Sequence, residues 1–423
     1  MSREGVPLRY LAEINPPTPE LARLGLDEEI SHLPLSAVWP DGELDVSRQV
    51  RLRDAGASQT VVREGDIIFP KVTPSFEHNR VAVARGLANG LAVASTEIHV
   101  VRPLMSELTD LLQYRLRAAD FQTQGRAEML GVAGLRRVPG RVVGELRVST
   151  ESIEHREKIV AFLDKRLARL GLLRQRLADL VPLARETRMA LIEEAFGSSA
   201  PGPRVPLWSA VDEARPIMYG IVLPGAHVPT GVPLIKAGDV QRGHLSVDEL
   251  DRTDAAIDKK HVRSRLQKGD VLLTIRGHVG DSAVVPPELE GANITQDTAR
   301  IAPRRGVSAS WLRLVLQAPS VQQRLVALTV GASIKGINIR DLKKVQVPMP
   351  PIDDQNGMVR AVEPRLQRLN RLIERAARMQ ELAVVYRDSL ITERILKSDV
   401  EQTGNRPAKG SDEPVLEPAL LVT

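Results

Sequence analysis

Four groups of polar residues in this 423-residue chain lie in segments where we expect loops. Arg and Lys side chains bind phosphate groups, and Asn, Gln, Asp, Glu and His side chains hydrogen-bond the edges of nucleic acid bases. The candidate contact residues are Lys71, Thr73, Ser75, Glu77, His78, Asn79 and Arg80 in the first group, Arg276 and His278 in the second, Asn293, Thr295, Gln296 and Asp297 in the third, and Lys335 and Asn338 in the fourth. For each residue the alternative is an ordinary solvated loop.

The sequence lacks the motifs of common catalytic sites. It has no GxxxxGK[ST] phosphate loop, no GxSxG elbow and no HExxH pair, and its eight His residues are dispersed. Asn15-Pro16-Pro17-Thr18 is similar to a motif of adenine aminomethyltransferases, but Thr18 replaces the aromatic residue of that motif, so we interpret it as a turn after the first strand. Gly65-Asp66 and Gly269-Asp270 each precede an apolar run and are interpreted as turns that enter strands. We therefore predict no catalytic residue and no metal site.

Composition narrows the class of protein further. The chain has 58 Lys+Arg against 53 Asp+Glu, which gives a net charge of +5, and 43% of its residues are hydrophobic, enough for well-packed cores. It contains no Cys, which excludes disulfides and zinc fingers and favours a reducing cytoplasm. No apolar run is long enough for a membrane span, so we expect no membrane partner. The aromatic content of 3% argues against single-strand binding by base stacking.

The chain contains two copies of one plan. Val6-Pro7-Leu8 recurs as Val205-Pro206-Leu207, and the segment that begins at Ile153 aligns with the segment that begins at Ile352, both at an offset of 199 residues. Two separate segments with a common offset indicate an internal repeat. The helical and entry-strand segments match, whereas the globular middles differ, which favours a shared scaffold that carries two different recognition surfaces.

Each copy ends in a segment with Leu, Ile and Val at helical spacing. This spacing predicts an amphipathic helix of about 35–40 residues. Such a helix needs a partner, and we expect the two long helices to pack on each other, with packing on their own domains as the alternative. The apolar stripes are wider than a helix pair needs, so further partner helices are expected. Pro182 is expected to kink or break the first helix.

The globular segments read mostly as short β-rich runs followed by a short helix, and we predict an α+β fold with antiparallel or mixed sheets. The predicted domains are 1–150 and 205–349, followed by helices at 151–197 and 350–397, with a linker at 198–204 and a disordered tail at 398–423.

These segments resemble the specificity subunits of type I restriction-modification enzymes. In the first copy, GDIIFPKVTPSFEHNR (65–80), ASTEIHVVRP (94–103) and MLGVAGLRRVPGRVVGELRVS (129–149) are similar to a target-recognition domain and its lead into a helix. In the second copy, the similar stretches are 219–240, 263–285 and 291–303, and GASIKGINIRDLKKVQVPMPPIDDQ (331–355) is similar to the domain exit and helix entry of that family. The resemblance covers residues 5–397.

The resemblance implies two α/β target-recognition domains separated by two long antiparallel helices, a coiled coil, with each domain reading one half of a bipartite, asymmetric duplex DNA site. At ~1.5 Å per residue, helices of 35–40 residues span ~55 Å and would set the spacing of the two half-sites. It also implies two docked methyltransferase subunits that use S-adenosylmethionine, and further motor-nuclease subunits that use ATP and Mg. This chain itself would bind no cofactor and hold no catalytic residue. The alternative interpretation is a non-catalytic coiled-coil scaffold for protein partners.

Overall fold

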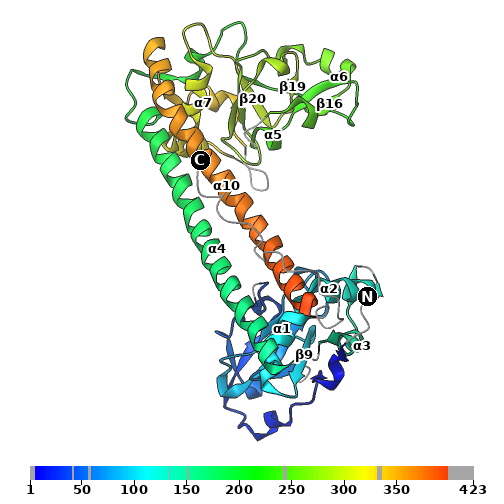
Figure 1. Cartoon of the computed structure of the whole chain (residues 1–423). Coiled ribbons are helices and arrows are strands. Elements are labelled where there is room, and N and C mark those ends of the chain that lie inside the picture. The colour runs from blue at the N-terminus through cyan, green and yellow to red at the C-terminus, as the bar shows by residue number, and fades with distance from the viewer. Residues whose placement is uncertain are drawn as a thin grey trace, which may run out of the picture. The chain divides into compact units, whose positions relative to one another are not determined.

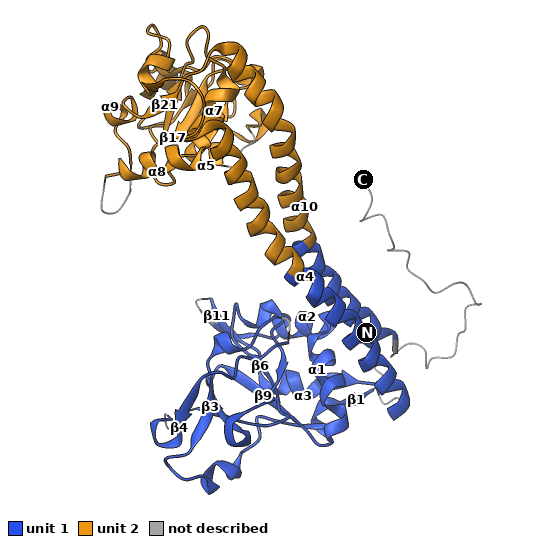
Figure 2. Ribbon diagram, turned by 90° about the vertical axis from the view of Figure 1, so that its left-hand side faces the viewer, with its two compact units in different colours: residues 1–175, 380–423 blue, residues 176–379 orange. Residues whose placement is uncertain are grey.

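The structure is a computed structural model that describes residues 5–40, 42–55, 59–132, 134–149, 152–241, 245–330 and 336–398. Lys335 and the predicted tail beyond residue 398 lie outside the described residues. The chain forms two compact units, unit 1 with residues 1–175 and 380–423 and unit 2 with residues 176–379 (Figure 2). Each unit contains one globular domain and a part of each of the two long helices, α4 (Ile153–Phe196) and α10 (Ile352–Ser398) (Figure 1).

The globular domain of unit 1 contains two four-stranded sheets. The first has the order β2 (Ala12–Ile14), β9 (Ile98–Pro103), β6 (Ile67–Pro70), β7 (Ala82–Val83), and the second has the order β4 (Gln49–Arg51), β3 (Glu29–Leu33), β8 (Leu91–Ala94), β5 (Thr60–Arg63). Two strand pairs stand apart, β1 (Val6–Pro7) with β12 (Arg147–Val148) and β10 (Leu130–Val132) with β11 (Leu135–Arg137). The helices are α1 (Thr109–Arg117), α2 (Ala119–Ala127) and α3 (Gly140–Glu145).

The globular domain of unit 2 repeats this topology. One sheet has the order β14 (Met218–Tyr219), β20 (Thr298–Ile301), β17 (Val271–Thr274), β18 (Ser282–Val284), and another has the order β16 (Asp251–Thr253), β15 (Val232–Ile235), β19 (Asn293–Ile294). The pair β13 (Arg204–Pro206) and β21 (Gln346–Pro348) matches β1 and β12. The helices are α5 (Ala237–Gln241), α6 (Ala255–Lys259), α7 (Ala309–Gln317), α8 (Pro319–Ala327) and α9 (Ile339–Leu342).

The strand pairings confirm the predicted mixed α+β class. All neighbours in the sheet around β6 are antiparallel, whereas β3 pairs with β8 in parallel, and β15 pairs with β19 in parallel at the equivalent place in unit 2. Strand β5 of the first domain has no counterpart among the strands described in the second. The two domains therefore share one framework and differ in what is attached to it.

Alternation along the central strands divides each domain into two cores. Ile67 and Phe69 face one core and Ile68 faces the other, because successive side chains of a strand point to opposite faces. Strand β17 repeats the pattern, with Val271 and Leu273 on one side and Leu272 on the other. The first core of unit 1 is aromatic, and Phe76 packs directly on Gly125, where a Cβ atom would lie 2.4 Å from Phe76 Cζ.

The long helices pack on each other and on the globular domain in both units. In unit 1, Ile159 and Leu163 of α4 join a cluster with Ile391 and Ile395 of α10 and with Leu111 of α1. In unit 2, the equivalent cluster contains Ile192 and Phe196 of α4, Leu366 of α10 and Trp311 of α7. In unit 1 the first residues of α4 meet the last residues of α10, and in unit 2 the last residues of α4 meet the first part of α10, so the two helices are antiparallel, as predicted.

The expected break at Pro182 is wrong, because α4 is helical from Ile153 to Phe196 with this proline inside it. Proline removes one backbone hydrogen bond from a helix, but tertiary packing can offset that loss. Leu177 and Ala184, on either side of Pro182, are both buried. Helix α10 likewise continues through Pro364.

Candidate nucleic-acid interface

The polar segment 71–80 follows β6 and is tied to the β10–β11 hairpin through Thr73. The Thr73 hydroxyl donates to the Gly134 carbonyl at 2.7 Å and accepts from the Arg136 N–H at 3.0 Å. The Thr73 N–H also donates to the Arg136 carbonyl at 2.9 Å. Thr73 therefore joins two chain segments, and the hairpin becomes part of the same surface as the loop.

The other predicted residues of this loop divide into exposed and structural positions. Glu77 and His78 are exposed, while Lys71, Ser75 and Arg80 are partly exposed. Asn79 is buried in the left-handed conformation, with a φ of 52°, and its side-chain amide donates to the Arg117 carbonyl at 2.9 Å. Asn is among the few residues that adopt this conformation readily, so Asn79 serves the turn itself.

In unit 2, two of the predicted loops meet at one hydrogen bond. The exposed Arg276 guanidinium donates to the Gln296 side-chain oxygen at 2.9 Å, from segments 20 residues apart. His278 is exposed at 3.6 Å from the Asp281 carboxylate, and Asp297 is partly exposed. The structure thus brings Arg276 and Gln296 together at the end of β17.

Asn293 and Thr295 lie inside the domain. The Asn293 side-chain amide donates to Asp258 at 2.9 Å, and its oxygen accepts from the Ser264 hydroxyl at 2.7 Å. Burial tends to raise the pKa of Asp258, but hydrogen bonds from Arg265 and Asn293 outweigh it and lower this pKa. Asn293 is fully buried and Thr295 nearly so, which gives them supporting positions behind the loop surface.

Asn338, the remaining predicted residue among those that the structure describes, is exposed at the start of α9.

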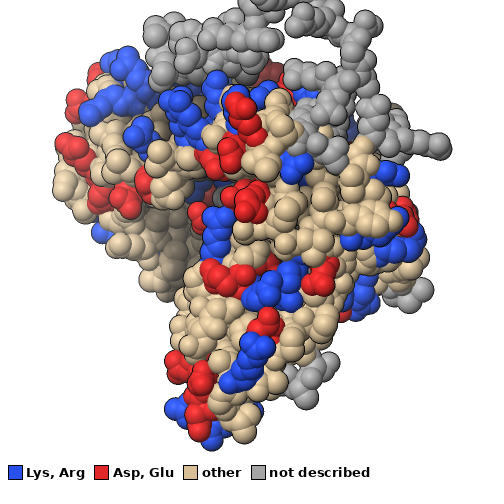
Figure 3. Space-filling view, turned by 60° about the horizontal axis from the view of Figure 1, so that its bottom comes forward, with Lys and Arg blue, Asp and Glu red and all other residues tan. Residues whose placement is uncertain are grey.

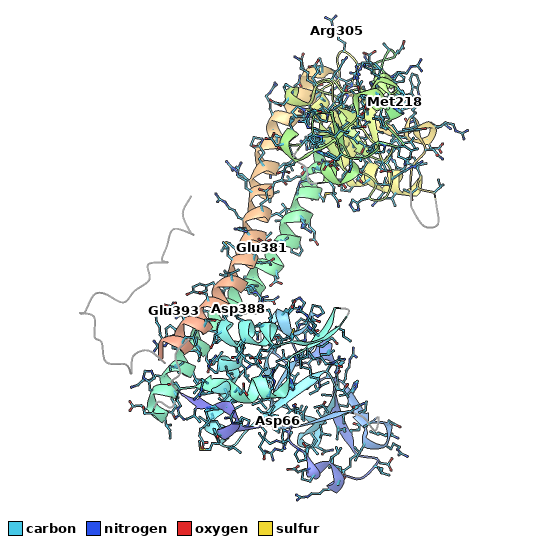
Figure 4. All side chains as sticks on the ribbon, turned by 90° about the vertical axis from the view of Figure 1, so that its right-hand side faces the viewer. Asp66, Met218, Arg305, Glu381, Asp388 and Glu393 are labelled. Atoms are coloured by element: carbon cyan, nitrogen blue, oxygen red, sulfur yellow. The ribbon has the colours of Figure 1, made fainter. Side chains whose placement is uncertain are left out.

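The two Gly-Asp dipeptides form turns into strands, as predicted from the sequence. The Asp66 carboxylate, labelled in Figure 4, accepts the Arg63 N–H at 2.8 Å and two hydrogen bonds from Arg102 at 2.8 Å. Asp270 accepts the Gln267 N–H at 2.8 Å and two bonds from Arg215 at 2.7 and 2.6 Å. Each carboxylate is buried and fully engaged in bidentate pairing, so both are structural residues.

The Asn15-Pro16-Pro17 segment also forms a turn, which follows β2 with Asn15 at a φ of 53°. Its side-chain amide lies 3.0 Å from His99 Nδ1, and its oxygen accepts the Val100 N–H at 3.0 Å. His99 Nε2 lies 2.8 Å from the Val138 carbonyl, which fits a neutral ring that donates from Nε2 and accepts at Nδ1. Burial lowers the pKa of His99 to about 4.

Sequence reasoning omitted the β10–β11 hairpin from the candidate contacts. Arg136 is exposed on it, and Arg137 makes two hydrogen bonds to the Glu97 carboxylate at 2.8 and 2.7 Å. The signal in the sequence was the Leu-Arg-Arg run that follows Gly134. On the face shown in Figure 3, Lys and Arg side chains are interspersed with Asp and Glu side chains. DNA contacts on this face would therefore come from individual loops and not from one continuous basic patch.

The described residues contain no group of three His, Cys, Asp or Glu side chains placed to hold a metal ion. Among the same residues, no helix combines the length and the apolar character that crossing a bilayer requires.

Comparison with solved structures defines the class of the fold. The chain aligns over 93% of its length with 97% of a chain solved in work on complex assembly and conformational transition of the type I R-M system, with a TM-score of 0.72 and 19% identity. It also aligns over 93% of its length with 96% of the HsdS subunit from Thermoanaerobacter tengcongensis, with a TM-score of 0.55 and 19% identity. The chain therefore has the fold of these two solved chains.

Curated relatives give the same answer at the level of sequence. The chain is 33% identical over 154 residues to the type I restriction enzyme EcoBI specificity subunit of Escherichia coli, a match that covers 36% of this chain and 32% of the relative. It is 29% identical over 161 residues to the EcoAI specificity subunit of the same organism, covering 37% of this chain and 26% of the relative. These homologues are specificity subunits of type I restriction enzymes, which confirms the resemblance predicted from the sequence. The matched segments cover less than a third of the length of each of these two relatives. No family model matches the chain.

Proposed function

We propose that this chain is the DNA sequence-specificity subunit of a type I restriction-modification complex. The observation that carries the proposal is the repeated domain, in which one topology presents two different sets of loop residues. The loop after β6 presents Lys71, Glu77 and His78, and the loop after β17 presents Arg276 and His278. Each domain reads one half of a bipartite duplex site, and because the two sets differ, the site is asymmetric.

The continuous long helices support a role in setting the spacing between the half-sites. Helix α4 contains 44 residues and α10 contains 47, and at ~1.5 Å per residue each is roughly 65–70 Å long. One turn of duplex DNA is only ~34–36 Å. Helices of this length allow two recognition domains to reach separate turns of one duplex.

Exposed leucines at repeated positions of the helices support the docking of two methyltransferase subunits. Leu173 on α4 is 40% exposed, and its counterpart Leu372 on α10, 199 residues later, is 38% exposed. Leu183 is 60% exposed, and its counterpart Leu382 is 50% exposed. Large apolar side chains that recur in this way on a helix favour a protein contact. Because the positions repeat, the two helices offer two similar docking surfaces.

The partners supply the chemistry in this proposal. Methyl transfer from S-adenosylmethionine to adenine takes place in the methyltransferase subunits, and ATP and Mg belong to motor-nuclease subunits where these are present. This chain binds DNA and partner proteins in the cytoplasm, without a cofactor or catalytic residue of its own.

Salt dependence separates this proposal from a protein-binding scaffold. Contacts to several phosphates release counterions, so the binding constant falls steeply as salt rises. We expect the chain, purified with its methyltransferase partner, to bind duplex DNA with a logarithmic salt slope of several units. The methyltransferase alone serves as the control. Equal binding and equal slope with and without this chain would contradict the proposal and favour the scaffold.

A further inference from the structure

The β10–β11 hairpin exposes two leucines on one face. Leu130 is 63% exposed and Leu135 is 51% exposed, although both belong to strands. Leu130 pairs with Arg137 and Val132 pairs with Leu135, so Leu130 and Leu135 project to the same side of the ribbon. An isolated two-stranded ribbon has little stability of its own, and apolar residues exposed on it favour a surface that covers them.

The hairpin is nevertheless held in a fixed position. Thr73 bonds both to its turn and to its second strand, and the Arg137–Glu97 pair anchors its end. Gly131 permits the close approach of the two strands, because a Cβ atom there would lie 2.3 Å from the Leu135 carbonyl oxygen. The ribbon is thus a positioned projection beside the candidate reading loop 71–80.

The second domain repeats the feature at an offset of 200 residues. Val330, the counterpart of Leu130, is 60% exposed and forms a backbone bridge with Gly336. Gly336 in turn bridges to Arg276, just as Arg137 bridges to Val72 in the first domain. Both domains therefore place an exposed aliphatic side chain next to the loop that follows their central strand.

The chemistry of this surface fits one occupant, the major groove of duplex DNA. That groove admits a two-stranded β-ribbon, and the group in it that apolar side chains contact is the thymine methyl. Arg136, paired across the ribbon with Gly131, projects from the opposite face and is exposed, in reach of phosphate or guanine. With Arg136 on one face of the ribbon and the two leucines on the other, a ribbon inserted in the groove can contact a phosphate with the first face and base edges with the second.

We propose that the β10–β11 ribbon enters the major groove of the half-site read by the first domain, where Leu130 and Leu135 contact thymine methyl groups. This inference rests on the proposed function and adds to it a specificity element and the base feature that the element recognises.

Replacing thymine by deoxyuridine tests the contact, because it removes only the methyl group. Once methylation sequencing has given the motif, the assembled methyltransferase complex is titrated with duplexes that carry deoxyuridine in the half-site of the first domain. We expect affinity to fall roughly fourfold per contacted methyl, the value of about one buried methylene. The same replacement in the other half-site reports on Val330 separately.

Variants assign the effect to the ribbon. Leu130→Ala with Leu135→Ala should weaken binding to the thymine duplex and abolish the difference between thymine and deoxyuridine. Leu104→Ala is the matched control, because Leu104 is 59% exposed in the same domain but lies outside the ribbon. Three results overturn the inference while leaving the proposed function intact: a half-site without thymine on either strand, no sensitivity of the wild type to deoxyuridine, or unchanged sensitivity in the double variant. Absence of any sequence-specific binding would instead overturn the proposed function.

Discussion

Glu193 of α4 and Thr392 of α10 occupy equivalent positions 199 residues apart, and each accepts a hydrogen bond from the first turn of a short helix. The Thr392 hydroxyl accepts the Ala119 N–H at 3.0 Å in unit 1, and the Glu193 carboxylate accepts the Ser320 N–H at 2.9 Å in unit 2. Proline at position 319 has no N–H to offer, so the longer Glu side chain reaches the next residue. The end of α10 thus caps α2, and the end of α4 caps α8. The first backbone N–H groups of a helix have no acceptor within the helix, and these side chains supply one.

Removal of the Glu193 cap should destabilise unit 2. Burial of Glu193 tends to raise its pKa, but hydrogen bonds from Ser198 and Ser320 outweigh this and lower it, so the ionised form is favoured. Glu193→Ala should cost about 1 kcal/mol of unfolding free energy in denaturant titrations, the usual value of a lost cap. Glu193→Gln keeps an acceptor and should lose less. No loss of unfolding free energy with Glu193→Ala would contradict the cap, and equal losses for the two variants would show that the single acceptor kept by Gln contributes nothing.

His99 should make the first domain less stable in mild acid. Its pKa in the folded state is about 4, against 6.5 in the unfolded chain, because burial disfavours the charged ring. Above pH 6.5 both states are neutral, and between 6.5 and about 4 only the unfolded state takes up the proton. The stability that neutral His99 contributes to the folded state is therefore present above pH 6.5 and is lost as pH falls from 6.5 to about 4. Over this window the free energy of unfolding falls by at most about 3 kcal/mol. His99→Gln stays neutral, so its unfolding free energy should fall less than that of the wild type between pH 7 and 4.5. Parallel profiles for the two proteins would contradict this assignment.

Much of the framework could be predicted from the sequence, because it rests on local signals. The Gly-Asp turns and the helical spacing of apolar residues are visible within short windows, and the repeat at an offset of 199 is visible when two such windows are compared. Asn293 is different, because its partners Ser264 and Asp258 lie 29 and 35 residues away, and a polar residue between strands gives no sign of such partners. The break that Pro182 was expected to cause is also absent, since tertiary packing outweighed a local preference.

The exposed loops should act on separate half-sites. Arg276→Ala should weaken or relax recognition of the half-site read by the second domain, by about 1–3 kcal/mol if the guanidinium contacts a base edge, and leave the other half intact. Lys71→Ala, in the first domain, is the reciprocal variant. Methylation sequencing of each variant measures both halves at once. Loss of both half-sites with Arg276→Ala, or of neither, would count against the assignment.

The repeated leucines should control the number of methyltransferase subunits. Leu173→Asp and Leu372→Asp each place a charge on one of the two docking surfaces, where burial of an unpaired carboxylate is costly. Native mass spectrometry of the co-expressed complex should show one methyltransferase subunit lost with either variant and both lost with the pair. Ser389→Asp, an exposed polar site on α10, is the control. Full occupancy in the paired variant would place the docking surface elsewhere.

The central claim is that this chain confers DNA sequence specificity on a methyltransferase. Its most direct test is single-molecule methylation sequencing of a host that expresses the chain with its methyltransferase, compared with a host that expresses the methyltransferase alone. The account predicts a split, asymmetric motif that is methylated only when the chain is present, and exchange of residues 1–150 for the domain of a relative should change one half of that motif. With both proteins expressed and associated, the absence of new methylation would contradict the account.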